Sequence, residues 1–155
     1  MFRVTEALLL ACLPLSTAAT APAASAQTAG PPQIAGVWQA EDGRMKIEMF
    51  DAGGAYAGRL LWGRRAVEAD GKTFKRDVNN PDPKLRTRSL QGIIILQGLK
   101  WDPKDQRWEG GTFYNGLSGR SMSAQVKLVN GKLEMRGYMG SPMLGRTITF
   151  RRVQS

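Results

Sequence analysis

The segment 77–88 carries the densest group of side chains that could do chemistry, in the order Asp77-Val78-Asn79-Asn80-Pro81-Asp82-Pro83-Lys84-Leu85-Arg86-Thr87-Arg88. Its carboxylates, amides and guanidinium groups could bind an anion or a sugar. Arg86 and Arg88 are two residues apart, so on an extended segment their side chains share a face and could clamp a carboxylate or phosphate. We therefore predict that ligand contacts come from Asp77, Asn79, Asp82, Arg86 and Arg88.

Two other interpretations of this segment stay open. Asp77 and Asp82 could bind Ca²⁺ together with the Asn carbonyl groups, although the spacing lacks the D-x-D-x-D-G pattern. Alternatively, these polar groups serve one another: Asp and Asn cap the turn, and the arginines pair with Asp77 or with carbonyl groups to fix a long loop. Asp82 followed by Pro83 also predicts one helical turn, with Asp82 as its cap.

Aromatic residues flank a predicted turn at 102–106. They are Trp101, Trp108, Phe113 and Tyr114. Sugar-binding proteins place aromatic rings in this way, and the packing of a hairpin also does so. We include Tyr114 in the predicted ligand site.

The composition excludes several kinds of catalysis and cofactor binding. The sequence has no histidine, and its one cysteine is Cys12. Zinc sites of Cys or His, haem held by His, and Cys–His nucleophile pairs are therefore excluded for the chain after Cys12. We predict no metal and no cofactor. Glu48, Glu109 and Glu134 lie in predicted strands and could form a carboxylate pair, so a hydrolase acting through Glu109 or Asp77 is kept as an alternative to non-catalytic binding.

The first 26 residues have the pattern of a secretion signal. The apolar stretch 7–15 is too short to span a bilayer, and Ala24-Ser25-Ala26 fits the A-x-A cleavage pattern. The sequence before Cys12 superficially resembles a lipoprotein box, but the apolar segment ahead of it is short. We predict a signal at 1–26, a linker at 27–33 and one domain at 34–155, located after cleavage near Ala26 in a bacterial periplasm or outside the cell.

The chain is strongly basic. It has 155 residues with 22 Lys and Arg against 13 Asp and Glu, a formal net charge of +9. Such a surface attracts anions such as lipid head groups and phosphorylated sugars. We predict no nucleic-acid partner, because a periplasm is a poor place to find nucleic acid. A generally cationic surface without a specific partner is the alternative.

From residue 34 onward the chain alternates polar and apolar residues between turn signals. Met45, Ile47 and Met49 alternate with Lys46 and Glu48, a period of two that is typical of half-buried strands. The pair Asn130-Gly131 is a strong hairpin signal. We expect strands at 36–41, 44–50, 56–62, 93–101, 107–114, 122–128, 132–139 and 146–153. About eight strands joined by hairpins predict an all-β, antiparallel, up-and-down barrel with one long irregular loop; a sandwich is the alternative.

Gly36-Val37-Trp38 on the first strand is typical of lipocalin-like barrels. In these barrels the Trp plugs the closed end, and a basic side chain from the last strand lies across it. Arg146, Arg151 or Arg152 could supply that cation, and we assign structural roles to Gly36, Trp38 and Arg146. Four methionines, Met45, Met49, Met135 and Met139, fall on predicted barrel-facing positions, where they could line a cavity or fill a core.

The sequence resembles the secreted bacterial family called domain of unknown function 2147. The matching motifs are Gly36-Val37-Trp38, Tyr56-Ala57-Gly58-Arg59-Leu60, the block 77–88, Trp108-Glu109-Gly110-Gly111 and Arg136-Gly137-Tyr138. The block D-x-x-N-P-D-P-x-L-R-x-R is the most specific of them. The resemblance implies an exported, single-domain, lipocalin-like barrel, and it implies no activity.

These observations together predict a monomeric periplasmic barrel that binds a small or lipidic anionic ligand without catalysis. In this interpretation the loop 77–88 contacts the ligand and the methionines line the interior. The alternative is an envelope protein with a filled core, whose basic face contacts anionic envelope components. Salt distinguishes the two, because surface charge contacts weaken as ionic strength rises.

Overall fold

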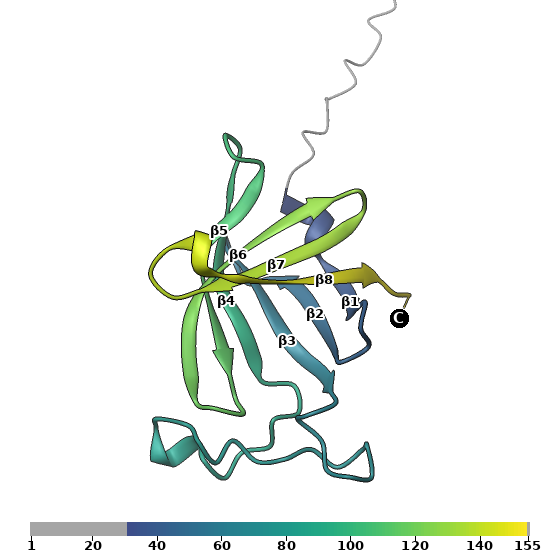
Figure 1. The fold of residues 1–155 in the computed structure, drawn as a ribbon, viewed down its shortest axis with the longest axis vertical. Coiled ribbons are helices and arrows are strands. Elements are labelled where there is room, and N and C mark those ends of the chain that lie inside the picture. The colour runs from purple at the N-terminus through teal and green to yellow at the C-terminus, as the bar shows by residue number, and fades with distance from the viewer. Residues whose placement is uncertain (1–30, 155) are drawn as a thin grey trace, which may run out of the picture.

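The computed structural model describes residues 31–154, so the predicted signal segment 1–26 lies outside the described residues. These residues form a closed barrel of eight antiparallel strands in sequence order (Figure 1). The strands are β1 (Gly36–Ala40), β2 (Met45–Asp51), β3 (Tyr56–Gly63), β4 (Ile94–Asp102), β5 (Arg107–Asn115), β6 (Arg120–Val129), β7 (Lys132–Tyr138) and β8 (Arg146–Arg152). Three short 3₁₀ turns accompany them: η1 (Pro31–Ile34), η2 (Pro83–Leu85) and η3 (Pro142–Leu144).

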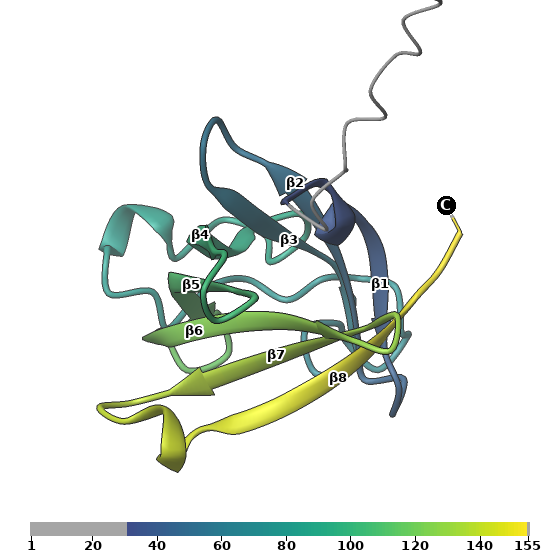
Figure 2. The same ribbon diagram turned by 90° about the horizontal axis from the view of Figure 1, so that it is seen from above.

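The barrel predicted from the alternating pattern is confirmed, with every strand within about two residues of its expected bounds. What makes it a barrel and not a sandwich is the pairing of β1 with β8, in which Trp38 lies opposite Arg152. Figure 2 shows the strands arranged in this ring. Closure removes the exposed strand edges that an open sheet would leave.

The strands alternate in direction, so their connections divide between two ends of the barrel. The β1–β2, β3–β4, β5–β6 and β7–β8 connections lie at one end, which we call the mouth end. The β3–β4 connection, residues 64–93, is by far the longest, and Figure 1 shows it spread across the lower end of the barrel. No helix among residues 31–154 is long and apolar enough to cross a membrane.

Bulky side chains fill the barrel at the opposite, closed end. Trp38, Trp108 and Phe150 are completely buried. The indole of Trp38 donates to the carbonyl oxygen of Ile34 at 2.8 Å, and burial of so many rings supplies much of the hydrophobic stabilisation. The closed end is therefore packed core and not a cavity.

Arg152 is the cation that lies over Trp38, at 4.3 Å from the ring centroid. This corrects the structural role expected for Arg146, which begins β8 near the mouth end and pairs in register with Gly137. The Arg152 guanidinium also donates to the carbonyl oxygens of Ala35, at 2.7 Å, and Gln33. Gly36 permits this arrangement, because a Cβ there would lie 2.6 Å from Arg152 Nη1.

The methionines do not share one environment. Met49 and Met135 are buried in the core, whereas Met45 is half-buried. Met139 lies beyond the end of β7 and is 68% exposed, so its expected barrel-facing position is wrong. The chain leaves the barrel wall one residue earlier than the alternation suggests.

Candidate functional site

The long connection is held to the barrel by a buried carboxylate. Asp77 is completely buried. Its Oδ2 accepts from Arg88 Nε at 2.9 Å and Nη2 at 2.8 Å, and from Asn80 Nδ2 at 2.8 Å. Its Oδ1 accepts from the hydroxyl of Tyr114 on β5 at 2.5 Å. We call Asp77, Asn80, Arg88 and Tyr114 the loop network, and in it every member bonds to another member.

The environment of the loop network keeps the Tyr114 hydroxyl protonated. Burial, reinforced by the hydrogen bond and the negative charge of Asp77, raises the pKa of Tyr114 to about 12. The hydroxyl therefore acts as a donor to Asp77, while its oxygen accepts from Asn80 Nδ2 at 3.0 Å. A charged group buried with several hydrogen bonds avoids the cost of an unpaired buried charge.

The other predicted ligand residues also bond within the protein. Asn79 Nδ2 donates to the Leu117 carbonyl oxygen at 2.7 Å, which ties the loop to the β5–β6 turn. Asp82 caps η2 by accepting from the Lys84 amide at 3.0 Å, as the sequence predicted. Arg86 Nε donates to the Asn80 carbonyl oxygen at 2.8 Å. The structure thus brings Asp77, Arg88 and Tyr114 together as a connection between loop and barrel, and leaves Asp82 and Arg86 exposed at the outer turn.

An apolar pocket opens inside the mouth end of the barrel. Its volume is about 220 Å³. Met45, Leu60, Phe113 and Ile148 line it from four strands, and Leu90 and Ile93 cover it from the long connection. We call this the mouth pocket. Arg44 and Arg65 stand among its lining residues as cations.

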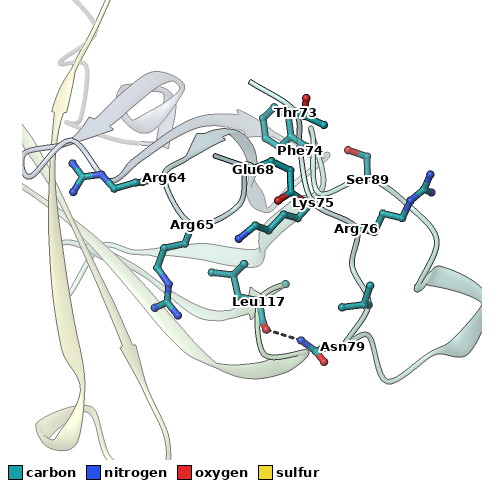
Figure 3. Close-up of a pocket in the computed structure, with 12 residues that line it drawn as sticks. Arg64, Arg65, Glu68, Thr73, Phe74, Lys75, Arg76, Asn79, Ser89 and Leu117 are labelled. Carbon is teal, nitrogen blue, oxygen red and sulfur yellow. Dashed lines mark hydrogen bonds between the residues drawn. The ribbon is translucent and has the colours of Figure 1, made fainter. Parts of the chain in front are cut away.

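A larger groove adjoins the mouth pocket on the side of the long connection. Its volume is about 930 Å³. Its charged lining consists of four cations and one acid, namely Arg64, Arg65, Lys75, Arg76 and Glu68 (Figure 3). We call this the basic groove. It shares Arg65, Gly116 and Leu117 with the mouth pocket, so an apolar cavity and a cationic one meet at Arg65.

Most of these cationic side chains form no hydrogen bond or ion pair within the described residues that would stabilise the fold. Within residues 31–154, the side chains of Arg64, Arg65 and Lys75 make no hydrogen bond or ion pair with another residue. Arg76 donates to the Thr87 carbonyl oxygen. Figure 3 shows Arg64, Arg65 and Lys75 as separate side chains, with Lys75 pointing toward the centre of the view and Arg64 projecting away from it. Three cationic groups therefore have their hydrogen-bonding capacity available for a ligand.

A small hairpin inside the long connection gathers these cations, and the sequence analysis missed it. Val67 pairs with Phe74 as an isolated bridge, and Asp70 Oδ1 holds the turn by accepting from the Lys72 and Thr73 amides at 2.8 Å each. The signal was Asp70-Gly71, a dipeptide that favours tight hairpin turns. It lies between two basic pairs, Arg64-Arg65 and Lys75-Arg76, and folding at this turn brings those pairs together.

Two of the three strand carboxylates considered for catalysis, Glu48 and Glu109, sit in separate ion pairs. Glu48 binds Arg59 at 2.9 Å on the β2–β3 face. Arg107 bridges Glu109 at 2.7 Å and Asp105 at 2.6 Å. Asp102, Asp105 and Glu109 offer oxygens within 4.8 Å of one another, but the guanidinium of Arg107 already compensates two of them. This cluster is an ion-pair network at the closed end.

A closed eight-stranded antiparallel barrel with a pocket at one end defines a lipocalin-like protein. A similar solved structure is that of protein HP1028 from the human pathogen Helicobacter pylori, which belongs to the lipocalin family. The two are 26% identical, with a TM-score of 0.66 over 79% of this chain and 84% of that chain. The family model for an uncharacterized protein conserved in bacteria (DUF2147) matches residues 36–152, and the chain belongs to this family. No curated protein matches the chain.

Proposed function

We propose that this protein binds a small amphiphile that carries one anionic group, without catalysing a reaction on it. The apolar part of the ligand occupies the mouth pocket, and its anionic group lies in the basic groove. The observation that carries this proposal is the junction at Arg65, where the two cavities share lining residues. An amphiphile is the class of ligand whose two ends match the two cavities.

The size of the mouth pocket limits the apolar part. An apolar cavity of about 150 Å³ accepts benzene, and the mouth pocket measures about 220 Å³. It therefore fits one ring or a short alkyl chain. A longer chain would extend into the basic groove, where Phe74, Val78 and Leu117 offer apolar contacts.

The anionic group would be bound by Arg65 and Lys75. Hydrogen bonds to a charged partner contribute about 1.5–3 kcal/mol, and the guanidinium of Arg65 can contact a carboxylate or phosphate through two donors. The sequence predicted that Arg86 and Arg88 would bind the anionic group. Both donate hydrogen bonds within the protein, so we assign this role to cations whose side chains have no such bond within residues 31–154.

We further propose that the protein acts after export, in a periplasm or outside the cell. The A-x-A pattern at Ala24-Ser25-Ala26 supports this location. Cleavage there would leave a chain without cysteine, whose stability comes from core packing and the closed sheet.

Titration calorimetry with octanoate and with octan-1-ol tests the proposal. We expect octanoate to bind, and octan-1-ol, which lacks the charge, to bind at least about tenfold more weakly, as expected when one charge-assisted hydrogen bond is lost. Arg65→Gln should weaken octanoate binding to a similar extent. Lys104→Gln removes the same charge from the closed-end β4–β5 turn and serves as the matched control. Equal octanoate affinity in the two variants would reject the basic groove as the anion site.

A second candidate is an envelope protein that acts through its basic surface alone. The packed interior around Trp38, Trp108 and Phe150 favours it, because little of the barrel is hollow. In that case binding to anionic polymers would fall steeply with salt, and octanoate would not bind. The same calorimetry, repeated at two salt concentrations, separates the two candidates.

A further inference from the structure

The β7–β8 connection exposes three large apolar side chains in seven residues. Met143 is 88% exposed, Leu144 81% and Met139 68%. Figure 2 shows η3 at the outer end of β7 and β8, away from the ring of strands. We call these three residues the apolar tip. Large apolar side chains exposed together are typical of sites that contact a protein partner or a membrane.

The apolar tip is held in a fixed conformation. The guanidinium of Arg136 on β7 donates to the carbonyl oxygens of Pro142, at 2.6 Å, and Met143, at 3.2 Å, and to Thr147 Oγ1 at 2.8 Å. Ser141 caps η3 by accepting from the Met143 amide at 3.3 Å. The Arg136 side chain and the Ser141 cap therefore hold η3 in place while Met143 and Leu144 face outward.

The part of the sequence that carries the apolar tip is almost free of acidic residues. From residue 110 to residue 155 there is one acid, Glu134, against seven basic residues. The basic residues are Arg120, Lys127, Lys132, Arg136, Arg146, Arg151 and Arg152. Arg146 and Arg120 begin β8 and β6 at the mouth end, and both are exposed. A negatively charged surface would be attracted to these two cations at the mouth end.

We infer that the apolar tip docks this protein on an anionic lipid bilayer. Met139, Met143 and Leu144 enter the acyl boundary, and Arg120 and Arg146 meet the head groups. Apolar insertion combined with electrostatic attraction is the general basis of interfacial membrane binding. The tip belongs to the mouth end, so a docked barrel has its ligand-binding end near the lipid. This inference does not depend on the proposed function, since the tip lines neither the mouth pocket nor the basic groove.

Vesicle co-sedimentation tests the inference, using the protein as it is purified from the cells that produce it. We expect binding to vesicles of phosphatidylcholine mixed with phosphatidylglycerol, and much weaker binding to phosphatidylcholine alone. The double variant Met143→Ser/Leu144→Ser should bind the mixed vesicles at least about tenfold more weakly. Leu85→Ser is the matched control, because Leu85 is an exposed apolar residue (37%) on a different connection and lines neither cavity, so its loss should leave vesicle binding unchanged. All variants share the same N-terminal residues, so any contribution of those residues cancels.

A second measurement reports insertion directly. Leu144→Cys labelled with a nitrobenzoxadiazole dye should brighten and shift to the blue when mixed vesicles are added, and the unsubstituted protein labelled in parallel reports any signal from Cys12. An unchanged dye spectrum on vesicle-bound protein overturns the inference, as does equal vesicle binding by the double variant and the wild type. Absence of any vesicle binding also overturns it. Wild-type self-association that the double variant abolishes, with vesicle binding unaffected, would assign the tip to a second copy instead.

Discussion

The hydroxyl of Tyr114 on β5 donates a 2.5 Å hydrogen bond to Asp77, 37 residues earlier in the chain. Tyr114 also lines the mouth pocket. One side chain therefore joins the barrel wall, the buried carboxylate of the long connection and the pocket. The position of the long connection and the shape of the pocket depend on each other through this contact.

Replacing Arg88 should destabilise the protein much more than replacing Arg86. Arg88→Met leaves the Asp77 carboxylate buried without its cation, and removal of one partner of a buried pair costs about 3 kcal/mol or more. Arg86→Met removes one hydrogen bond to a carbonyl oxygen, worth about 1 kcal/mol. Urea unfolding of both variants measures the difference. Similar losses in the two variants would show that Asp77 does not need Arg88.

Raising the pH should weaken the fold through Tyr114. The pKa of Tyr114 is raised from 10.0 to about 12 in the folded protein, so above pH 10 the unfolded chain loses this proton while the folded chain keeps it. The free energy of unfolding should therefore fall between pH 10 and pH 12, and the stabilisation is fully present only below that range.

Comparison with Tyr114→Phe isolates this effect. The variant should be less stable at neutral pH, because it lacks the hydrogen bond to Asp77. Its free energy of unfolding should fall less between pH 10 and pH 12, because the contribution of Tyr114 to that decrease is gone. The difference between the ultraviolet titration curves of wild type and variant gives the pKa of Tyr114 itself. An ionisation of Tyr114 near pH 10 would contradict the buried arrangement.

The sequence allowed the barrel to be predicted because strand formation depends on local signals. The alternation of Met45, Ile47 and Met49 with polar residues, and the turn at Asn130-Gly131, are both visible within a few residues. The cap at Asp82 is equally local. Of the three arginines considered for the closing cation, the structural role was assigned to Arg146, whereas Arg152 fills it. The choice depends on the β1–β8 register, which is set by pairing between the two ends of the barrel sequence.

The candidate site was harder to predict for a related reason. Asp77 and Arg88 are residue types typical of a binding site, but in the folded protein they form an ion pair with each other. Arg65 and Lys75, whose side chains are available to a ligand, come together only through the turn at Asp70-Gly71 and the docking of the loop on the barrel. Sequence reasoning can find polar residues, but it does not show which of them are already paired.

Substitution of Gly119 should release the long connection from the barrel. Gly119 has φ +67°, and a Cβ there would lie 1.7 Å from the carbonyl oxygen of Asn79. Gly119→Ala should therefore increase hydrogen exchange across 77–93 while the strands stay protected. Gly110→Ala is the control, because Gly110 has φ +71° but no atom within 4 Å of such a Cβ. Equal exchange of 77–93 in both variants would mean that backbone strain alone matters.

Loss of Arg152 should open the closed end of the barrel. Arg152→Met removes the cation over Trp38 and the donors to Ala35 and Gln33, and we expect a loss of about 1–3 kcal/mol. Arg151→Met is the control, because Arg151 is exposed and its one side-chain hydrogen bond within residues 31–154 is to Gln39 at 3.3 Å; it should change stability by less than about 0.5 kcal/mol. Thermal unfolding of the two variants decides whether the position of the arginine matters.

Native mass spectrometry of the protein with octanoate tests ligand binding in the mouth pocket most directly. We predict one bound octanoate on the wild type, lost on denaturation, and none on Ile148→Trp, whose larger side chain fills the pocket from β8. The variant must keep the wild-type thermal midpoint to within a few degrees for the comparison to hold. A wild type that stays bare, or an Ile148→Trp variant that binds octanoate as well as the wild type, would show that the mouth pocket is not the binding site.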